Sequence, residues 1–195
     1  MRLVALEVEN FRAYKDRRRI DFKDLTTFIG KNDIGKSTIL EALEIFFNND
    51  VVKIEGSDAS VGSGNQRVSI LCEFSEFPEI ITLDAGAVTT LAGEYLLAEN
   101  GNLQIEKVFD CSKAKPSEQV FLVCNHPSAE GFSDLLNLKE KELQARVKQL
   151  GLDVALKGNP SMRQAIWASA ESLECKLQHL ELGRSKEDGK AVWDR

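Results

Sequence analysis

The sequence lacks a long hydrophobic run, a leader peptide and paired cysteines, and each absence excludes a class of protein. Apolar stretches such as Val120–Cys124 are far shorter than the roughly 20 residues that span a bilayer. Glu7 and Glu9 interrupt the N-terminal segment where a signal peptide needs apolar residues. The four cysteines have no paired spacing, so the sequence predicts neither a disulfide framework nor a zinc site. We expect a cytoplasmic protein with no membrane partner.

An excess of basic residues is also missing. The chain has 25 Lys and Arg residues against 31 Asp and Glu residues, which gives a formal net charge of −6. Freestanding nucleic-acid coat proteins are usually basic, so this balance argues against that class. A larger assembly could still bind DNA through a local patch. The 195 residues, 43% of them hydrophobic, fit one globular domain or one large lobe of a domain.

Strand-like segments dominate the chain before about residue 130, and helical periodicity dominates after it. Alternating or β-rich composition predicts strands at 3–11, 17–22, 25–29, 67–74, 79–83, 94–98, 103–109 and 118–124. The nearly uncharged segment 25–29 is expected to be buried on both faces in the centre of a sheet. Asn100-Gly101 predicts a hairpin turn between the strands at 94–98 and 103–109.

Two apolar stripes predict helices. From Lys36 onward the first stripe is expected to lie on the sheet and consists of Ile39, Leu43, Phe46 and Phe47. The second stripe lies near the C-terminus and consists of Met162, Ile166, Leu173, Leu177 and Leu180. This second stripe fits a helix packed on a common core or, alternatively, the root of a coiled-coil arm.

A phosphate-binding motif follows the segment 25–29. Gly30-Lys31-Asn32-Asp33-Ile34-Gly35-Lys36-Ser37 matches G-x-x-x-x-G-K-[ST]. In a loop of this kind, successive backbone N–H groups point into a concave site that binds an anion, and the following helix adds its free N-terminal amides. Gly30 and Gly35 allow a close backbone approach that a Cβ would obstruct. We expect Lys36 to reach the β- and γ-phosphates of ATP, Ser37 to bind Mg²⁺, and Thr38 to lie near the α-phosphate.

The residues around this motif resemble ABC-type ATPase heads. The matching elements are Leu6-x-Val8-x-Asn10-Phe11-Arg12, Ile20-Asp21-Phe22 and Phe28-Ile29 leading into the motif. Over about residues 1 to 47 they are similar to the heads of SMC, RecF and RecN proteins and of OLD (overcoming lysogenization defect) nucleases. Asn32-Asp33 resembles the OLD group, because SMC and RecF heads usually have Asn-Gly there. The resemblance implies an α/β P-loop NTPase fold, a mixed sheet with an antiparallel N-terminal subsheet.

The same resemblance implies a function. OLD proteins join an ATPase head to a C-terminal Toprim nuclease domain, and in ABC-type heads two copies sandwich two nucleotides. An ATP-dependent endonuclease of DNA repair or phage defence is therefore implied, with a second copy of the head, and possibly DNA, as partners. The resemblance also implies that Arg12 approaches the nucleotide or the partner head, although a surface ion pair explains Arg12 equally well. Gln119 is a candidate for the glutamine that senses the γ-phosphate and Mg²⁺.

Other parts of the ABC machinery are not recognisable in the sequence. Hydrolysis requires a strand of four apolar residues followed by Asp-Glu, but Ala85 follows Asp84 in the segment that resembles it most. A Ser-Gly-Gly-type signature and a Toprim carboxylate cluster are also not found, so no residue is assigned as catalytic. We therefore expect residues 1–129 to be the N-terminal lobe of a P-loop ATPase head and 130–195 a helical segment of it, with a C-terminal lobe missing.

Two other functions fit the motif. A regulatory module that binds nucleotide without catalysis would need no acidic strand. A small P-loop kinase would need a lid rich in arginine, yet residues 130–194 contain only Arg146, Arg163 and Arg184. The sequence leaves open whether this chain alone is an enzyme.

Overall fold

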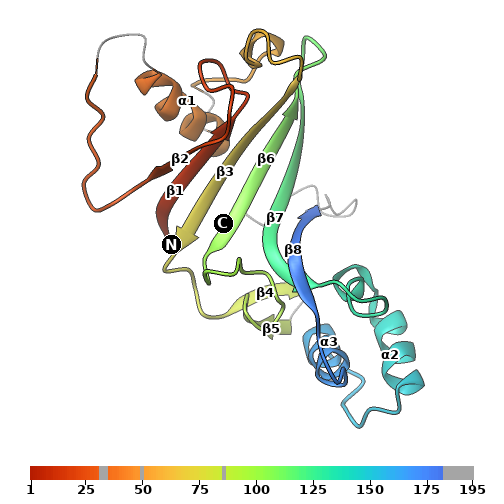
Figure 1. The fold of residues 1–195 in the computed structure, drawn as a ribbon. Coiled ribbons are helices and arrows are strands. Elements are labelled where there is room, and N and C mark those ends of the chain that lie inside the picture. The colour runs from red at the N-terminus through yellow and green to blue at the C-terminus, as the bar shows by residue number, and fades with distance from the viewer. Residues whose placement is uncertain (31–34, 49–50, 85–86, 182–195) are drawn as a thin grey trace. The chain divides into compact units, whose positions relative to one another are not determined.

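A computed structural model describes residues 1–30, 35–48, 51–84 and 87–181. It contains a six-stranded sheet in the order β2-β1-β3-β6-β7-β8 and a two-stranded sheet of β4 and β5 (Figure 1). The contacts divide the described residues into a first unit, within Met1–Phe77, Asn102–Leu122 and 180–181, and a second unit, within Pro78–Gly101 and Val123–His179. The predicted boundary near residue 130 stays a prediction.

The helices and strands are β1 (Arg2–Glu9), β2 (Arg18–Asp21), α1 (Lys36–Phe46), β3 (Arg67–Ser75), β4 (Ile81–Asp84), β5 (Ala87–Thr89), β6 (Leu103–Asp110), β7 (Ser117–Pro127), α2 (Glu140–Gln149), α3 (Asn159–Ala168) and β8 (Cys175–Glu181). Two short 3₁₀ turns cover Gly56–Asp58 and Leu135–Asn137. The alternation of apolar and charged residues correctly predicted β1, β2, β3, β6 and β7. The pairs β1–β2, β1–β3, β3–β6 and β6–β7 are all antiparallel.

One face of the sheet in the first unit is apolar and packs against α1. Side chains alternate between the two faces of a strand, so β3 presents four nearly inaccessible side chains here, Val68, Ile70, Cys72 and Phe74. The ring of Phe46 on α1 lies 6.2 Å from that of Phe74. This packing fixes the helix that follows the phosphate-binding motif to the sheet.

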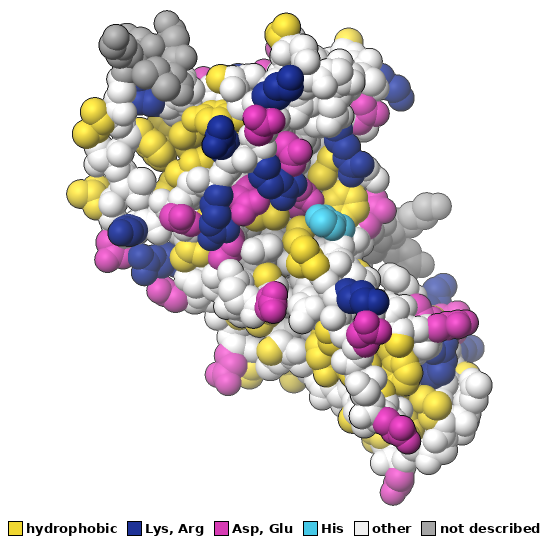
Figure 2. Space-filling view, viewed as in Figure 1, with side chains coloured by type: hydrophobic (Ala, Val, Ile, Leu, Met, Phe, Trp, Pro, Cys, Tyr) yellow, Lys and Arg dark blue, Asp and Glu magenta, His cyan; other side chains and the backbone are white. Residues whose placement is uncertain are grey.

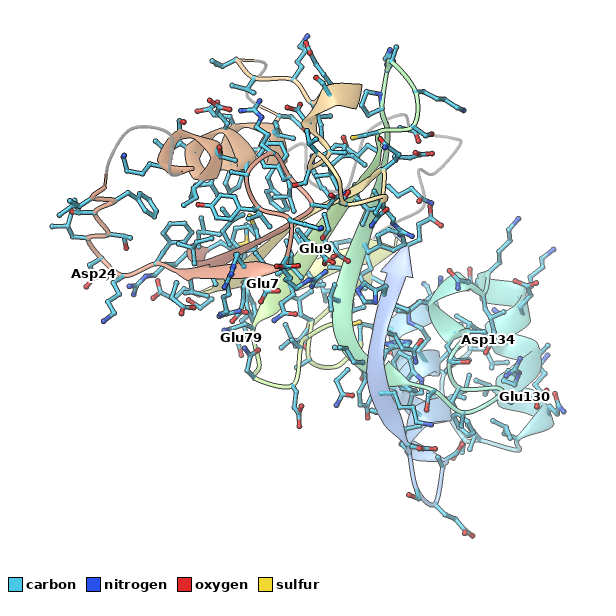
Figure 3. All side chains as sticks on the ribbon, turned by 45° about the horizontal axis from the view of Figure 1, so that its top comes forward. Glu7, Glu9, Asp24, Glu79, Glu130 and Asp134 are labelled. Atoms are coloured by element: carbon cyan, nitrogen blue, oxygen red, sulfur yellow. The ribbon has the colours of Figure 1, made fainter. Side chains whose placement is uncertain are left out.

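The opposite face of the same strands carries a network of charged side chains. Arg19 donates to Glu73 at 2.8 Å, and Arg17 donates to Glu106 at 3.0 Å. Both carboxylates are almost fully buried. Figure 2 shows acidic and basic side chains gathered over these strands, and Figure 3 shows Glu7 and Glu9 on β1. Ion pairs therefore cover this side of the sheet where many proteins place a second apolar layer.

Acid is expected to destabilise the first unit through Glu73. Burial opposes ionisation of this carboxyl, but hydrogen bonds from Arg19, Asn102 and Gln104 outweigh it and lower its pKa from 4.5 to about 2. A depressed carboxyl pKa stabilises the fold above the unfolded-state pKa, and this contribution is lost as the pH falls from about 4.5 to 2. In urea unfolding, Glu73→Gln should reduce the unfolding free energy near pH 7 by roughly 1–3 kcal/mol and flatten its acid dependence.

The control for this prediction is Glu76→Gln. Glu76 is exposed and pairs with Arg2 at 3.5 Å, so its replacement should leave both the stability and its acid dependence nearly unchanged. Equal acid dependence of the wild type and Glu73→Gln would contradict the prediction.

The second unit is built around an apolar cluster between α2 and α3. Its buried members are Leu135, Leu143, Val147, Met162, Ile166 and Trp167. Beside it lies a buried ion pair, in which Arg163 Nε donates to Glu94 Oε2 at 2.6 Å. Thr89 donates its hydroxyl to the other oxygen of Glu94 at 2.7 Å. Trp167 is thus a packing residue of this cluster.

His126, also in the second unit, is a buried structural histidine. Its Nδ1 lies 3.1 Å from the carbonyl oxygen of Tyr95, and its ring meets Trp167 edge-on. Because a carbonyl only accepts, we assign the proton to Nδ1. Burial lowers the pKa of His126, which favours the neutral form of the ring.

The predicted buried strand at 25–29 is wrong. No main-chain hydrogen bond joins this segment to another residue that the structure describes. Leu25 is 85% exposed and Ile29 is 91% exposed. The two central positions in the sheet belong instead to β3 and β6, and β3 pairs with β1 on one side and β6 on the other. Apolar composition shows that a segment tends to be buried, but it does not show which partners are present to bury it.

Three further predictions differ from the structure. Residues 94–98 form turns instead of a strand, because Glu94 is held by the buried pair with Arg163. Gly101 does adopt a positive φ of 78°, but β6 pairs with β3 and β7, so no hairpin joins it to 94–98. Cys175–Glu181 is strand β8, so the helical stripe does not continue past α3.

The buried face of α1 is rotated from the predicted stripe. Ile39 and Phe46 are buried as expected, but Phe47 is 46% exposed, and Ala42 and Ile45 are buried instead. Within the described residues, none of the helices is both long and apolar enough to cross a bilayer.

Candidate functional site

The N-terminus of α1 carries the end of the phosphate-binding motif. Gly35 is the N-cap residue and has φ 86° and ψ 10°, a left-handed conformation that glycine adopts without strain. The first helical hydrogen bond runs from Ile39 N–H to the Gly35 carbonyl at 3.2 Å. The first turn contains no acidic residue, and among the described residues no side chain forms a capping hydrogen bond at Gly35. No carboxylate in the first turn therefore neutralises the positive end of the helix dipole, so this end can attract an anionic ligand.

The two ends of the motif are joined by its lysine. Lys36 Nζ donates to the carbonyl oxygen of Gly30 at 2.6 Å, which brings the ammonium group back across the loop. Ser37 is exposed at the start of the helix, whereas Thr38 is buried. Lys31, Asn32, Asp33 and Ile34 lie outside the described residues. The described part of the loop thus places a cation, an open hydroxyl and helix amides together.

Tyr14 is a neighbour of the motif that sequence reasoning missed. Its hydroxyl donates to the Gly35 carbonyl at 3.2 Å. A Cβ added to Gly35 would lie 2.9 Å from this hydroxyl and 3.0 Å from Tyr14 Cε2. Gly35 is therefore required both for its positive φ and for the close approach of Tyr14. One sequence signal could have indicated this contact, because Tyr14 belongs to the same turn as Asn10-Phe11-Arg12.

Arg12 is engaged in ion pairs. Its guanidinium group pairs with Glu41 on α1, and its Nε donates to Asp58 at 2.7 Å. Glu41 follows Ser37 by four residues, so the two side chains project from the same side of the helix. The surface ion pair considered for Arg12 is thus present. A contact of Arg12 with nucleotide or with a partner head remains a prediction.

Gln119 is exposed on β7. Its amide donates to Glu181 Oε1 at 3.3 Å. Its proposed role in sensing the γ-phosphate remains a prediction.

The chemistry of the site fits a magnesium ion that arrives with a nucleotide. Among the described residues no group of three or more His, Cys, Asp or Glu side chains could hold a metal. Mg²⁺ usually keeps several waters and takes phosphate oxygens in addition to few protein ligands. Ser37, whose hydroxyl is open, can supply one oxygen of this kind.

A family model described as an AAA ATPase domain matches residues 1–195. The chain belongs to this family. Membership of the AAA ATPase domain family implies nucleotide binding and ATPase chemistry, typically with Mg²⁺. The mixed α/β fold with its antiparallel sheet is consistent with a P-loop ATPase domain. Among curated proteins, none matches the chain.

Proposed function

We propose that this AAA ATPase domain binds ATP·Mg²⁺ at residues 30–38 and forms the N-terminal lobe of an ABC-type ATPase head. The main support is the N-terminus of α1, which begins directly after the left-handed Gly35, has no acidic residue in its first turn and lies beside the Lys36 ammonium group. Helix amides, dipole and cation all favour an anion at one place. Lys36 would bind the β- and γ-phosphates, and Ser37 would hold Mg²⁺, which neutralises phosphate charge.

Exposed apolar residues support a further lobe in the complete head. Leu25 and Ile29 precede the motif and are largely exposed, and Leu40 on α1 is 56% exposed. We propose that the C-terminal lobe, which would carry the acidic strand and the signature, covers these side chains in the complete head.

The finer proposal is an OLD-like ATP-dependent endonuclease that acts in DNA repair or phage defence. Two heads would enclose two nucleotides, so that ATP binding controls DNA processing. It rests on the resemblance of residues 1–47 and on Asn32-Asp33. An Asp-Glu strand and a Toprim carboxylate cluster encoded after Arg195 would support it. A reading frame that stops there would instead favour a regulatory module that binds nucleotide without catalysis.

Isothermal titration calorimetry of the 195-residue chain tests the nucleotide site. We expect the wild type to bind Mg·ATP and Mg·ADP. Lys36→Ala should weaken this binding by roughly 10- to 100-fold, because hydrogen bonds to charged groups contribute about 1.5–3 kcal/mol. Lys176→Ala is the matched control, since Lys176 is exposed and pairs with Glu174 at 3.0 Å. Absence of binding by the wild type, or equal binding by Lys36→Ala, would refute the site.

A measurement of ATP hydrolysis by the isolated chain tests separately the proposal that this chain is only one lobe of an ATPase head. We expect slow turnover at most, because the sequence shows no acidic strand or signature. Steady turnover by a monomer that is lost in Lys36→Ala would show that the head needs no further lobe.

A further inference from the structure

The turn between β1 and β2 contacts the N-terminus of α1 through Tyr14. The Gly35 carbonyl accepts two hydrogen bonds, one from Ile39 N–H and one from the Tyr14 hydroxyl, each at 3.2 Å. The phenol ring also lies against the Gly35 Cα, on the side where other residues carry a Cβ. The N-cap residue of the helix is therefore held from outside the helix.

Tyr14 is itself held in a fixed position. Phe11 and Tyr14 exchange two main-chain hydrogen bonds, at 3.0 and 2.9 Å, which closes a tight turn. Asn10 is 2% exposed, and its side-chain amide donates to the carbonyls of Asn65 and Arg67 at 2.8 and 2.9 Å. The phenol thus reaches Gly35 from a support that is fastened to the start of β3.

A second contact joins the same turn to α1. Arg12 pairs with Glu41 on the helix, and its main-chain N–H donates to the Asp58 carbonyl at 2.7 Å. Tyr14 and Arg12 therefore contact α1 at its N-cap, Gly35, and six residues further along, at Glu41. The pair also neutralises Glu41, a carboxylate that would oppose a nearby anion.

We propose that Tyr14 is a positioning residue of the nucleotide site. By holding the carbonyl and Cα of Gly35, it keeps this residue left-handed and the amides of the first helical turn directed at the phosphates. The inference rests on the proposed binding of nucleotide at residues 30–38. A neutral hydrogen bond contributes about 0.5–1.5 kcal/mol, so its loss should weaken nucleotide binding roughly three- to tenfold.

Fluorine NMR of the whole chain labelled with 3-fluorotyrosine can test the coupling directly. The chain contains two tyrosines, Tyr14 and Tyr95, so two signals are expected, and Tyr14→Phe assigns them. Tyr95 packs edge-on against Trp167 in the second unit and serves as the internal control. Addition of Mg·ADP should shift the Tyr14 signal and leave the Tyr95 signal in place.

Calorimetry of two matched variants completes the test. Tyr14→Phe removes one hydroxyl and keeps the ring, so we expect roughly three- to tenfold weaker Mg·ADP binding with little change in thermal stability. Tyr95→Phe should bind like the wild type. If the wild type binds Mg·ADP but the Tyr14 signal does not move and Tyr14→Phe binds normally, the positioning role is wrong. If the wild type does not bind any nucleotide, the proposed function fails instead.

Discussion

Replacing Arg163 with methionine is expected to lower the free energy of unfolding of the second unit by about 3–5 kcal/mol. Arg163 and Glu94 are 1% and 0% exposed, and 2.6 Å separates their paired atoms. The methionine leaves Glu94 as a buried carboxylate without its guanidinium partner, and the desolvation cost of that charge is no longer offset. The loss should therefore be far larger than that of a surface ion pair.

Urea unfolding followed by Trp167 fluorescence measures this effect. Trp167 lies in the apolar cluster of the same unit, and Trp193→Phe removes the other tryptophan of the chain. Lys176→Met removes an exposed pair and should cost at most about 1 kcal/mol. Combining Arg163→Met with Glu94→Gln should recover part of the loss, because no buried charge then remains. A change below about 1 kcal/mol in the single variant would contradict the argument.

Gly35→Val is expected to weaken nucleotide binding by roughly 100-fold or more. A left-handed conformation costs a residue other than glycine about 1–3 kcal/mol. The added Cβ would also lie 2.9 Å from the Tyr14 hydroxyl, so the ring must move and its hydrogen bond is lost. Together these effects centre on about 3 kcal/mol if the strain is imposed when the loop closes on the nucleotide, which corresponds to the expected change in affinity.

Gly64→Val is the matched control for this substitution. Gly64 also has a positive φ, 70°, but nothing lies within 4 Å of the position that a Cβ would take. Its replacement should lower the free energy of unfolding, because valine is strained in the left-handed conformation, and leave the nucleotide affinity unchanged. Calorimetry with Mg·ADP separates the two variants. Similar affinities of Gly35→Val and the wild type would show that the nucleotide does not depend on this glycine.

Patterns within a few neighbouring residues correctly predicted several strands and the position of the phosphate-binding motif. Charge at Glu7 and Glu9 between apolar residues placed β1, and the G-x-x-x-x-G-K-[ST] spacing placed the loop at the start of α1. Both signals depend on neighbours within a few residues. They are therefore visible without knowledge of the rest of the fold.

The predictions that were wrong or missed concern features that depend on residues far away in the sequence. Segment 25–29 has the composition of a central strand, but β3 and β6 occupy the centre of the sheet. Residues 94–98 have strand-like composition, yet Glu94 pairs with Arg163, which is 69 positions away. The contact of Tyr14 with Gly35 spans 21 positions and likewise has no local pattern. Tertiary pairing overrides local propensity at each of these places.

The order in which the strands of the first unit can assemble follows from their connections. The hairpin of β6 and β7 closes the short segment 111–116, whereas the pairing of β1 with β3 closes 10–66, which is about ten times longer. Closing the longer loop costs about 2 kcal/mol more in chain entropy. The phosphate-binding loop lies inside that longer loop. We therefore expect the β6–β7 hairpin to form early during refolding. The phosphate-binding loop should reach its final conformation only when β1 pairs with β3.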